Sequence, residues 1–251
     1  MVKIGFCSVT FRQLNVSEVI DVAKNAGAEG IEWGGDVHVT DTQTAKCVSE
    51  KMKKEGLLTF SYGSYYKCDG TEKEMERLIN IAAILGAKNI IVWAGTKSPK
   101  GVTNEERQEI ADNLKAFCDM ADKYGINISL EYHRNTLTEN AESAIRLVKD
   151  VDKPNLKCQW QANPDISFEE NCAELSKLLS VGDHFGNVHI FNMQRDNSFR
   201  SLSEIEDNLC QYHKIMSGTG KNRLYILEFC KGNSTEEFYK DMQALKNIVK
   251  K

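Results

Sequence analysis

The feature that most constrains this chain is a repeated alternation of short apolar segments with longer, helix-length segments. Glycines separate the two kinds of segment at Gly27, Gly56, Gly86 and Gly125, which lie 29, 30 and 39 residues apart. Glycine at such a place permits the positive φ with which many helices end. A spacing of this size is typical of one strand followed by one helix, so the sequence predicts a repeated βα unit.

Eight short segments have the composition of buried strands. They are "KIGFCSV", "GIEWG", "LTFSYG", "NIIVWAG", "NISLEYH", "LKCQWQ", "NVHIFN" and "RLYILEF". Segments between them have helical apolar spacing, as in Val16–Ala26. Strands that alternate with helices predict a parallel sheet. A chain of 251 residues fits one closed (βα)8 barrel of the α/β class, a TIM barrel, as a single domain over residues 1–251.

Polar residues in capping-box spacing predict where several helices begin. The pairs are Thr71 with Glu74, Thr103 with Glu106, Ser167 with Glu170, Ser203 with Glu206, and Ser234 with Glu237. The last helix is expected to extend from Ser234 to Val249. No G-x-G-x-x-G or P-loop sequence follows a strand, which argues against an open, nucleotide-binding sheet.

Charge, hydropathy and cysteine spacing exclude several classes of protein. The net charge is −4 and the calculated pI is about 5.8, so we expect no nucleic-acid partner. No window approaches the roughly 18 apolar residues of a membrane span, and we expect no membrane partner. The eight cysteines form no C-x-x-C pair, and the first residues lack the features of a signal peptide. We therefore predict reduced thiols in a cytoplasmic protein.

Polar side chains lie at the ends of four consecutive predicted strands. Glu131 shares a face of its strand with His133, because side chains alternate along a strand. Gln161, His189 and Glu228 occupy similar places on the next three strands. The carboxyl ends of the strands form the active-site face of such a barrel. We therefore expect Glu131, Gln161, His189 and Glu228 to converge at one mouth.

Two carboxylates and one imidazole near one axis need compensation. Either one carboxyl group has a raised pKa, or a divalent cation neutralises both. Ligands of this type suit Mn²⁺, Mg²⁺, Co²⁺ or Zn²⁺. Taken singly, a glutamate near a strand end is commonly a surface residue, and a histidine between apolar neighbours is commonly a hydrogen-bonded core residue. Their occurrence on consecutive strand ends favours a metal or acid–base site.

The chain resembles the xylose isomerase-like barrel superfamily of sugar isomerases and epimerases over nearly its whole length. The resemblance rests on "GIEWGGDVHV", "LEYHRNTLT", "NVHIFN" and "YILEF". In the epimerase branch a divalent metal is held by Glu, Asp, His and Glu. The resemblance implies that Glu131, His189 and Glu228 are metal ligands and that Gln161 stands in the place of the aspartate.

Further residues are implicated in binding a small carbohydrate substrate. Arg195 matches an arginine that contacts substrate oxygens in ketose epimerases, whereas Leu137 and Pro164 stand where those enzymes have polar contacts. In the family, the segment that matches "GIEWGGDVHV" lies beside the substrate, which favours Glu32 and His38 as substrate contacts. His38 also fits a solvated loop. His133 is expected to contact substrate or a metal ligand.

The sequence leaves open the role of the three tryptophans and the oligomeric state. Trp93, with Trp33 and Trp160, fits either the wall of a sugar pocket or plain core. The sequence is also compatible with a homo-oligomer, which it does not specify.

The first hypothesis is a metal-dependent sugar isomerase or epimerase. Glu131 and Glu228 would flank the substrate, one removing a proton beside the carbonyl and the other returning a proton. A bound cation would polarise the carbonyl and stabilise the enediolate. Alternatives are a lyase or dehydratase that begins with the same proton abstraction, and a non-catalytic sugar-binding barrel. An endonuclease of this fold needs a three-metal cluster with more histidines than the five present.

Gln161 is the residue on which the choice between enzyme and binding barrel depends most. An amide brings no charge, so Glu131 and Glu228 would give the ligand set −2 instead of −3. We predict a retained but weaker metal, tightened by Gln161→Asp. Alternatively, Gln161 hydrogen-bonds the substrate, or the metal has been lost.

Overall fold

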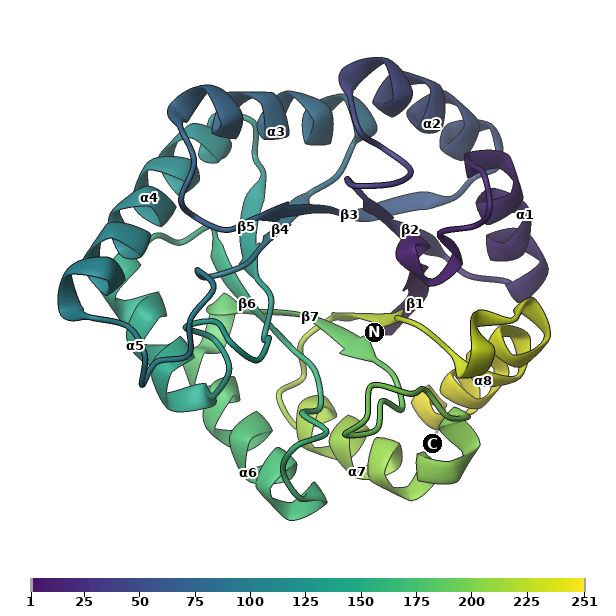
Figure 1. The fold of residues 1–251 in the computed structure, drawn as a ribbon. Helices are drawn as coiled ribbons and strands as arrows, with labels where there is room; N and C mark the ends of the chain where they lie inside the picture. The colour runs from purple at the N-terminus through teal and green to yellow at the C-terminus, as the bar shows by residue number, and fades with distance from the viewer. Residues whose placement is uncertain (1, 251) are drawn as a thin grey trace.

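The βα units close into a barrel, with the strands on the inside and a ring of helices around them (Figure 1). The computed structural model describes residues 2–250. All neighbouring strands are parallel, and β1 pairs with β8 to complete the circle. The strands are β1 (Val2–Cys7), β2 (Gly30–Gly34), β3 (Leu58–Tyr66), β4 (Asn89–Val92), β5 (Asn127–Leu130), β6 (Leu156–Trp160), β7 (Phe185–Ile190) and β8 (Arg223–Leu227).

One α-helix follows each strand and covers the outside of the barrel. Within residues 2–250 the helices are α1 (Val16–Ala26), α2 (Thr42–Lys54), α3 (Glu72–Leu85), α4 (Asn104–Asp122), α5 (Ala141–Val151), α6 (Phe168–Leu178), α7 (Glu206–Ser217) and α8 (Thr235–Val249). The predicted (βα)8 barrel is therefore confirmed. The four glycines of the repeat all have positive φ, between 59° and 80°, as expected of residues that end helices.

Side-chain caps begin most of the helices where the sequence predicts them. Thr103 and Ser167 each form a complete capping box, and Thr71 and Ser234 each accept a hydrogen bond from the backbone three residues later. These bonds satisfy backbone N–H groups that the first turn leaves without a partner. The caps fix the helix starts just after the loops that carry the site.

The predicted cap at Ser203 is wrong. Ser203 lies inside a short 3-10 turn, Leu202–Ile205, and α7 begins after it at Glu206 with no side-chain cap. The backbone N–H of Leu202 donates to Asp241 of α8 at 2.8 Å, and the Leu202 side chain is buried. This anchor holds the turn against α8, and the α-helix starts only after it.

Strand alternation divides apolar from polar side chains as the sequence predicts. Ile128 and Leu130 of β5 face the helices and are fully buried. On β6 the opposite face carries Lys157, Gln159 and Gln161, which point into the barrel from its base to its mouth. In and just after β6 the inward face is thus polar, unlike the branched apolar residues that commonly fill such barrels.

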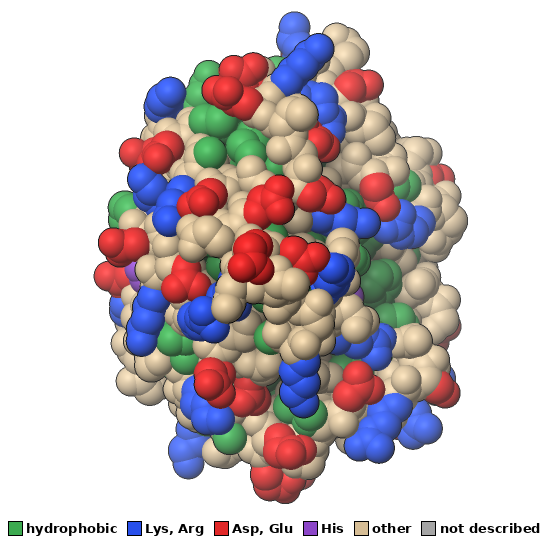
Figure 2. All heavy atoms as spheres, turned by 60° about the vertical axis from the view of Figure 1, so that its left-hand side comes forward, with side chains coloured by type: hydrophobic (Ala, Val, Ile, Leu, Met, Phe, Trp, Pro, Cys, Tyr) green, Lys and Arg blue, Asp and Glu red, His purple; other side chains and the backbone are tan. Residues whose placement is uncertain are grey.

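The outer surface carries charges of both signs. Figure 2 shows lysine, arginine, aspartate and glutamate side chains interspersed on one side of the molecule, without a large area of one sign. Among residues 2–250, every helix is too short or too polar to cross a lipid bilayer. All eight cysteines are free thiols, five of them buried.

Candidate active site

A cavity of about 210 Å³ opens at the carboxyl ends of the strands. We call it the upper cavity. Side chains or backbone from β2, β3, β4, β7 and the loops after β1, β5, β6 and β8 line it. The predicted residues that line it are Glu32, Trp93, Glu131, His133, Gln161, His189 and Glu228. Seven residues chosen from the sequence therefore meet in one place.

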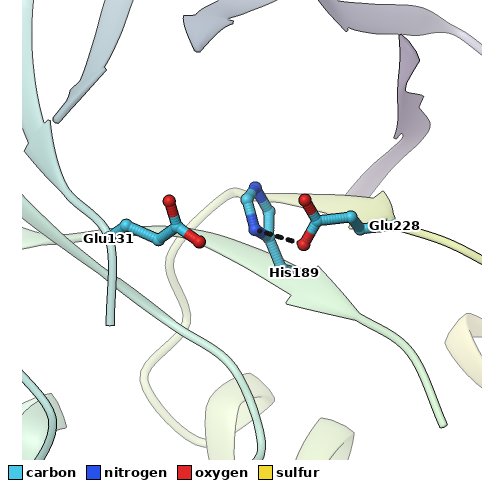
Figure 3. A group of neighbouring side chains, drawn as sticks. All are labelled: Glu131, His189 and Glu228. Carbon is cyan, nitrogen blue, oxygen red and sulfur yellow. Dashed lines mark ion pairs between the residues drawn. The ribbon is translucent and has the colours of Figure 1, made fainter. Parts of the chain in front are cut away.

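Glu131, His189 and Glu228 form the centre of the cavity. One donor atom from each lies within 4.8 Å of the donor atoms of the other two. Figure 3 shows the two carboxylates on either side of the imidazole. Glu131 and Glu228 follow their strands directly, and their backbone N–H groups donate to Val92 and Ile190 at 3.0 and 2.9 Å. The sheet ladder thus continues past the strand ends and fixes both carboxylates.

His189 is held by contacts at both ring nitrogens. Its Nε2 lies 3.0 Å from Oε1 of Glu32, and Glu32 in turn accepts a 2.5 Å hydrogen bond from the Ser61 hydroxyl. Its Nδ1 lies 3.2 Å from both Glu228 Oε2 and Gln161 Oε1. With Nε2–H donated to Glu32, Nδ1 is the nitrogen that faces the other candidate ligands.

Burial and charge compete in the His189–Glu32 pair. Burial alone would lower the pKa of His189, but the charges of Glu32 and Glu228 outweigh it and raise that pKa well above its usual value. Burial alone would raise the pKa of Glu32, but the charge of His189 and the hydrogen bonds from His189 and Ser61 lower it. The pair therefore favours a protonated imidazole beside an ionised Glu32.

Glu131 has a pKa well above that of an ordinary carboxyl group. Burial, and next the nearby charge of Glu228, raise the pKa of Glu131 to about 7. The indole N–H of Trp93 donates to Glu131 Oε2 at 2.6 Å and partly offsets this rise. A carboxyl group with such a pKa can take up or release a proton near neutral pH.

The donor set fits a divalent cation. Glu131 and Glu228 offer carboxylate oxygens, His189 offers Nδ1, and Gln161 offers an amide oxygen next to it. Hard and borderline divalent cations take oxygen and imidazole ligands of this kind. A cation would also neutralise the two carboxylates that face each other across His189. Glu32 completes the pattern in which a carboxylate orients a ligating histidine.

Trp93 and His133 form one wall of the upper cavity. Their rings stack with centroids 4.5 Å apart and planes 19° apart. The Nδ1 of His133 is 2.6 Å from the carbonyl oxygen of Arg134, which fixes the ring. Burial lowers the pKa of His133, so the ring is neutral near pH 7. Trp33 and Trp160, by contrast, are buried in the core and do not line this cavity.

Two predicted substrate contacts are not brought to the cavity. His38 is buried against the loop after β1, with its ring nitrogens 3.0 Å from Ser8 Oγ and from the carbonyl oxygen of Leu14. The turn after β2 carries it outward, because the backbone N–H of His38 bonds back to Gly34. Arg195 lies in an exposed loop, where its guanidinium donates to Pro164 and Asp165.

Glu32 lines the cavity but has a different role from the predicted substrate contact. Its two carboxylate oxygens are taken by His189 and Ser61. It is 2% exposed, as is the His189 that it holds. Glu32 therefore positions the imidazole of His189, and it is this imidazole, not Glu32, that is placed to contact a substrate.

Two arginines at the cavity were not assigned a role from the sequence. Arg12, after β1, pairs with Asp36 at 2.7 Å and donates to the Tyr65 hydroxyl at 3.3 Å. Arg134 pairs with Asp165 at 3.3 Å. Both arginines line the upper cavity. The only sequence feature that could have placed Arg134 at the cavity is its position directly after His133. Nothing in the loop sequence around Arg12 indicated that its side chain would reach the cavity.

A family model described as "Xylose isomerase-like TIM barrel" matches residues 20–207. A 3-dehydroshikimate dehydratase from Bacillus anthracis is 26% identical over 188 residues, which are 67% of each chain. A crystal structure of AsbF, a probable 3-DHS dehydratase from Bacillus anthracis, has a TM-score of 0.79 at 21% identity and covers 98% of this chain and 99% of its own.

Two further structures have the same fold. An IOLI protein with a bound zinc atom has a TM-score of 0.77 at 15% identity, with 98% of both chains covered. A 3-keto-D-glucoside 4-epimerase from E. coli has a TM-score of 0.74 at 17% identity, with both chains covered completely. With a closed eight-stranded barrel and a family match over most of its length, the chain belongs to the xylose isomerase-like TIM barrel family.

Proposed function

We propose that this protein is a divalent-metal-dependent enzyme that removes a proton from the carbon next to a carbonyl group. The observation that carries this proposal is the placement of Glu131 and Glu228 on either side of His189 in one cavity (Figure 3). A bound divalent cation would polarise the carbonyl and stabilise the negative charge that develops on its oxygen. Glu131, Gln161, His189 and Glu228 would hold it.

The two carboxyl groups divide the proton transfers between them. One carboxylate accepts the proton from carbon, and the electron pair left behind forms the enolate. Glu131, with a pKa of about 7, is suited to hold and return a proton near neutral pH. Glu228 lies across the imidazole from it, so the pair can serve opposite faces or neighbouring carbons of a substrate.

Elimination of water is the outcome that the site supports best. In that reaction the enolate electrons form a carbon–carbon double bond and expel the hydroxyl group on the next carbon. The second carboxyl group protonates the departing hydroxyl, and water is released. Two observations favour a dehydratase. One is the 26% identity to a 3-dehydroshikimate dehydratase. The other is the pair Arg12 and Arg134, which line the cavity beside their aspartate partners and would donate hydrogen bonds to an anionic hydroxyketone.

Epimerisation is the second candidate. It begins with the same proton abstraction and ends when the other carboxyl group returns a proton to the opposite face. The structural similarity to a 3-keto-D-glucoside 4-epimerase supports this reading, as does the placement of the two carboxylates on either side of His189. The cavity then holds a neutral sugar derivative, and the two arginines contact its hydroxyl groups.

Product analysis distinguishes the two outcomes. The protein is loaded with Mn²⁺, Mg²⁺, Co²⁺ or Zn²⁺ and incubated with 3-dehydroshikimate and with a panel of 3-keto-sugars. The dehydratase proposal predicts a product lighter by one water from the first substrate. Conversion of a keto-sugar to its epimer, with no change in mass, would replace it by the epimerase proposal. A non-catalytic barrel would convert none of these compounds with any cation.

A further inference from the structure

A second and larger cavity lies at the opposite end of the barrel. Its volume is about 680 Å³, within the range of small-molecule sites. It is lined by the first residues of several strands, including Lys3, Asn89, Asn127 and Lys157. We call it the base cavity. None of its lining residues lines the upper cavity, so the two are separate sites.

The base cavity has an apolar wall. Phe60 lies inside the barrel, packed so closely that a Cβ on Gly30 would come within 2.3 Å of its ring. Leu58, two residues before Phe60, is 43% exposed. It is one of three exposed large hydrophobic side chains among residues 2–250. Phe185 and Leu224 add to the wall. Phe60 and Phe185 are largely buried, so a ligand with a planar apolar body would cover mainly Leu58 and the half-buried Leu224 at the edge of these rings.

Several polar groups around this wall are donors that lack acceptors among the described residues. The ammonium groups of Lys3, Lys53 and Lys88 line the cavity and make no hydrogen bond or ion pair within the described part of the chain. The Nδ2 of Asn187 and the Nε of Arg223 are buried and also have no partner there. Both residues line the cavity and are 7% exposed. Buried donors of this kind are normally satisfied.

The charge of the lining is strongly positive. Five lining residues are cationic, and the one acidic residue, Asp183, is already paired with Lys221 outside the cavity. The guanidinium of Arg223 is held in place, 4.5 Å above the ring of Phe185 and bonded to its carbonyl oxygen at 3.1 Å. A fixed cation beside an aromatic ring presents charge and apolar surface together.

We propose that the base cavity is a second ligand site, which binds a small anion with a planar apolar body, such as an aromatic carboxylate. The apolar wall covers the body of the ligand. Asn187 and Arg223 donate to its anionic group at depth, and Lys53 and Lys88 attract it at the rim. This site is independent of the proton-abstraction chemistry at the other end of the barrel.

The test uses 8-anilinonaphthalene-1-sulfonate, a fluorescent aromatic anion, titrated into the full chain without added metal. The proposal predicts one saturable site and competition by benzoate. The double variant Lys53→Glu/Lys88→Glu should weaken binding by about tenfold, because two attractive charges become repulsive. Asn187→Asp, which keeps the side-chain volume, should weaken it by a similar factor. Circular dichroism confirms that each variant is folded.

Arg134→Glu is the matched control, because it reverses a charge at the upper cavity. It should leave binding of the probe within about twofold of the wild type, since Arg134 lines the upper cavity and not the base cavity. The proposal is overturned if the wild type shows no saturable binding. It is also overturned if both base variants bind as the wild type does, or if Arg134→Glu alone abolishes binding.

Discussion

Oε1 of Glu32 lies 3.0 Å from Nε2 of His189, and both side chains are 2% exposed inside the barrel. The two residues are 157 positions apart in the chain. This contact fixes the orientation of the imidazole and turns Nδ1 toward Glu228 and Gln161. The geometry at the centre of the site therefore depends on a residue that is not itself among the candidate ligands.

Glu32→Gln should weaken metal binding by about 10- to 100-fold, because it removes the charge that orients His189 and makes it more basic. Isothermal titration with Mn²⁺ or Zn²⁺ measures the change. Glu50→Gln, on the exposed face of α2, is the control and should bind metal as the wild type does. Equal affinity in both variants would mean that Glu32 does not act through His189.

Metal binding should strengthen as the pH rises through 7. Glu131 has a pKa of about 7, and the pKa of His189 is raised well above its usual value, so both hold protons at low pH. A cation must displace these protons. Each displaced proton costs about tenfold in apparent affinity for each pH unit below the pKa of its group. Titrations at pH 6, 7 and 8 test this, and equal affinity at all three would contradict it.

Gln161→Asp should bind the cation more tightly, by about tenfold or more, because it adds a charge to a ligand set that has two carboxylates. Gln161 Oε1 is 3.2 Å from His189 Nδ1, and an aspartate, one methylene shorter, would direct its carboxylate toward the same ligands from slightly farther away. Competition with a chromophoric chelator measures the affinity. Unchanged or weaker binding would place Gln161 outside the set of ligands and favour a role in holding substrate.

Arg12→Ala and Arg134→Ala should raise KM for an anionic substrate by about tenfold each and change kcat little, because they act on binding and not on the proton transfer. Arg200→Ala is a suitable control, since Arg200 is exposed, pairs with Glu204 and does not line the upper cavity. Initial rates with 3-dehydroshikimate and with a neutral keto-sugar separate the effects. An equal loss with the neutral compound would show that the arginines do not select for charge.

Asp241→Asn should stabilise the protein at pH 7. Burial raises the pKa of Asp241 to about 6, and one of its oxygens has no partner within the described residues. A raised pKa means that the folded state favours the protonated form, so stability is lost as the pH rises from about 4 through 6. The gain should be about 1–2 kcal/mol at pH 7 and smaller at pH 5. Urea unfolding at both pH values measures it, and an equal effect at both would contradict the cause.

Much of this site could be predicted from the sequence because strands impose a period of two. That period placed Glu131 and His133 on one face of the predicted strand, whose end lies just past β5, and strand order placed Gln161, His189 and Glu228 next to them. The barrel itself followed from eight strand-like segments at the spacing of βα units. These features depend on local pattern, which the sequence displays directly.

The remaining features depend on contacts across the barrel and on loop conformation. Glu32 could be placed on an inward face, but its distance to His189 could not be derived from alternation. His38 follows a turn that bonds back to Gly34 and points away from the mouth. Arg12 and Arg134 reach the cavity from loops, and loop conformation depends on contacts such as Asp36 and Asp165 that lie elsewhere in the chain.

Solvent hydrogen exchange tests the central claim most directly. The metal-loaded protein is incubated in D₂O with 3-dehydroshikimate and with the keto-sugar panel, and the carbon next to the carbonyl is followed by NMR. The account predicts deuterium in substrate or product at that carbon, dependent on the cation and reduced by about 100-fold or more in Glu131→Gln or Glu228→Gln. No enzyme-dependent deuterium in any compound with any of the four cations would contradict it.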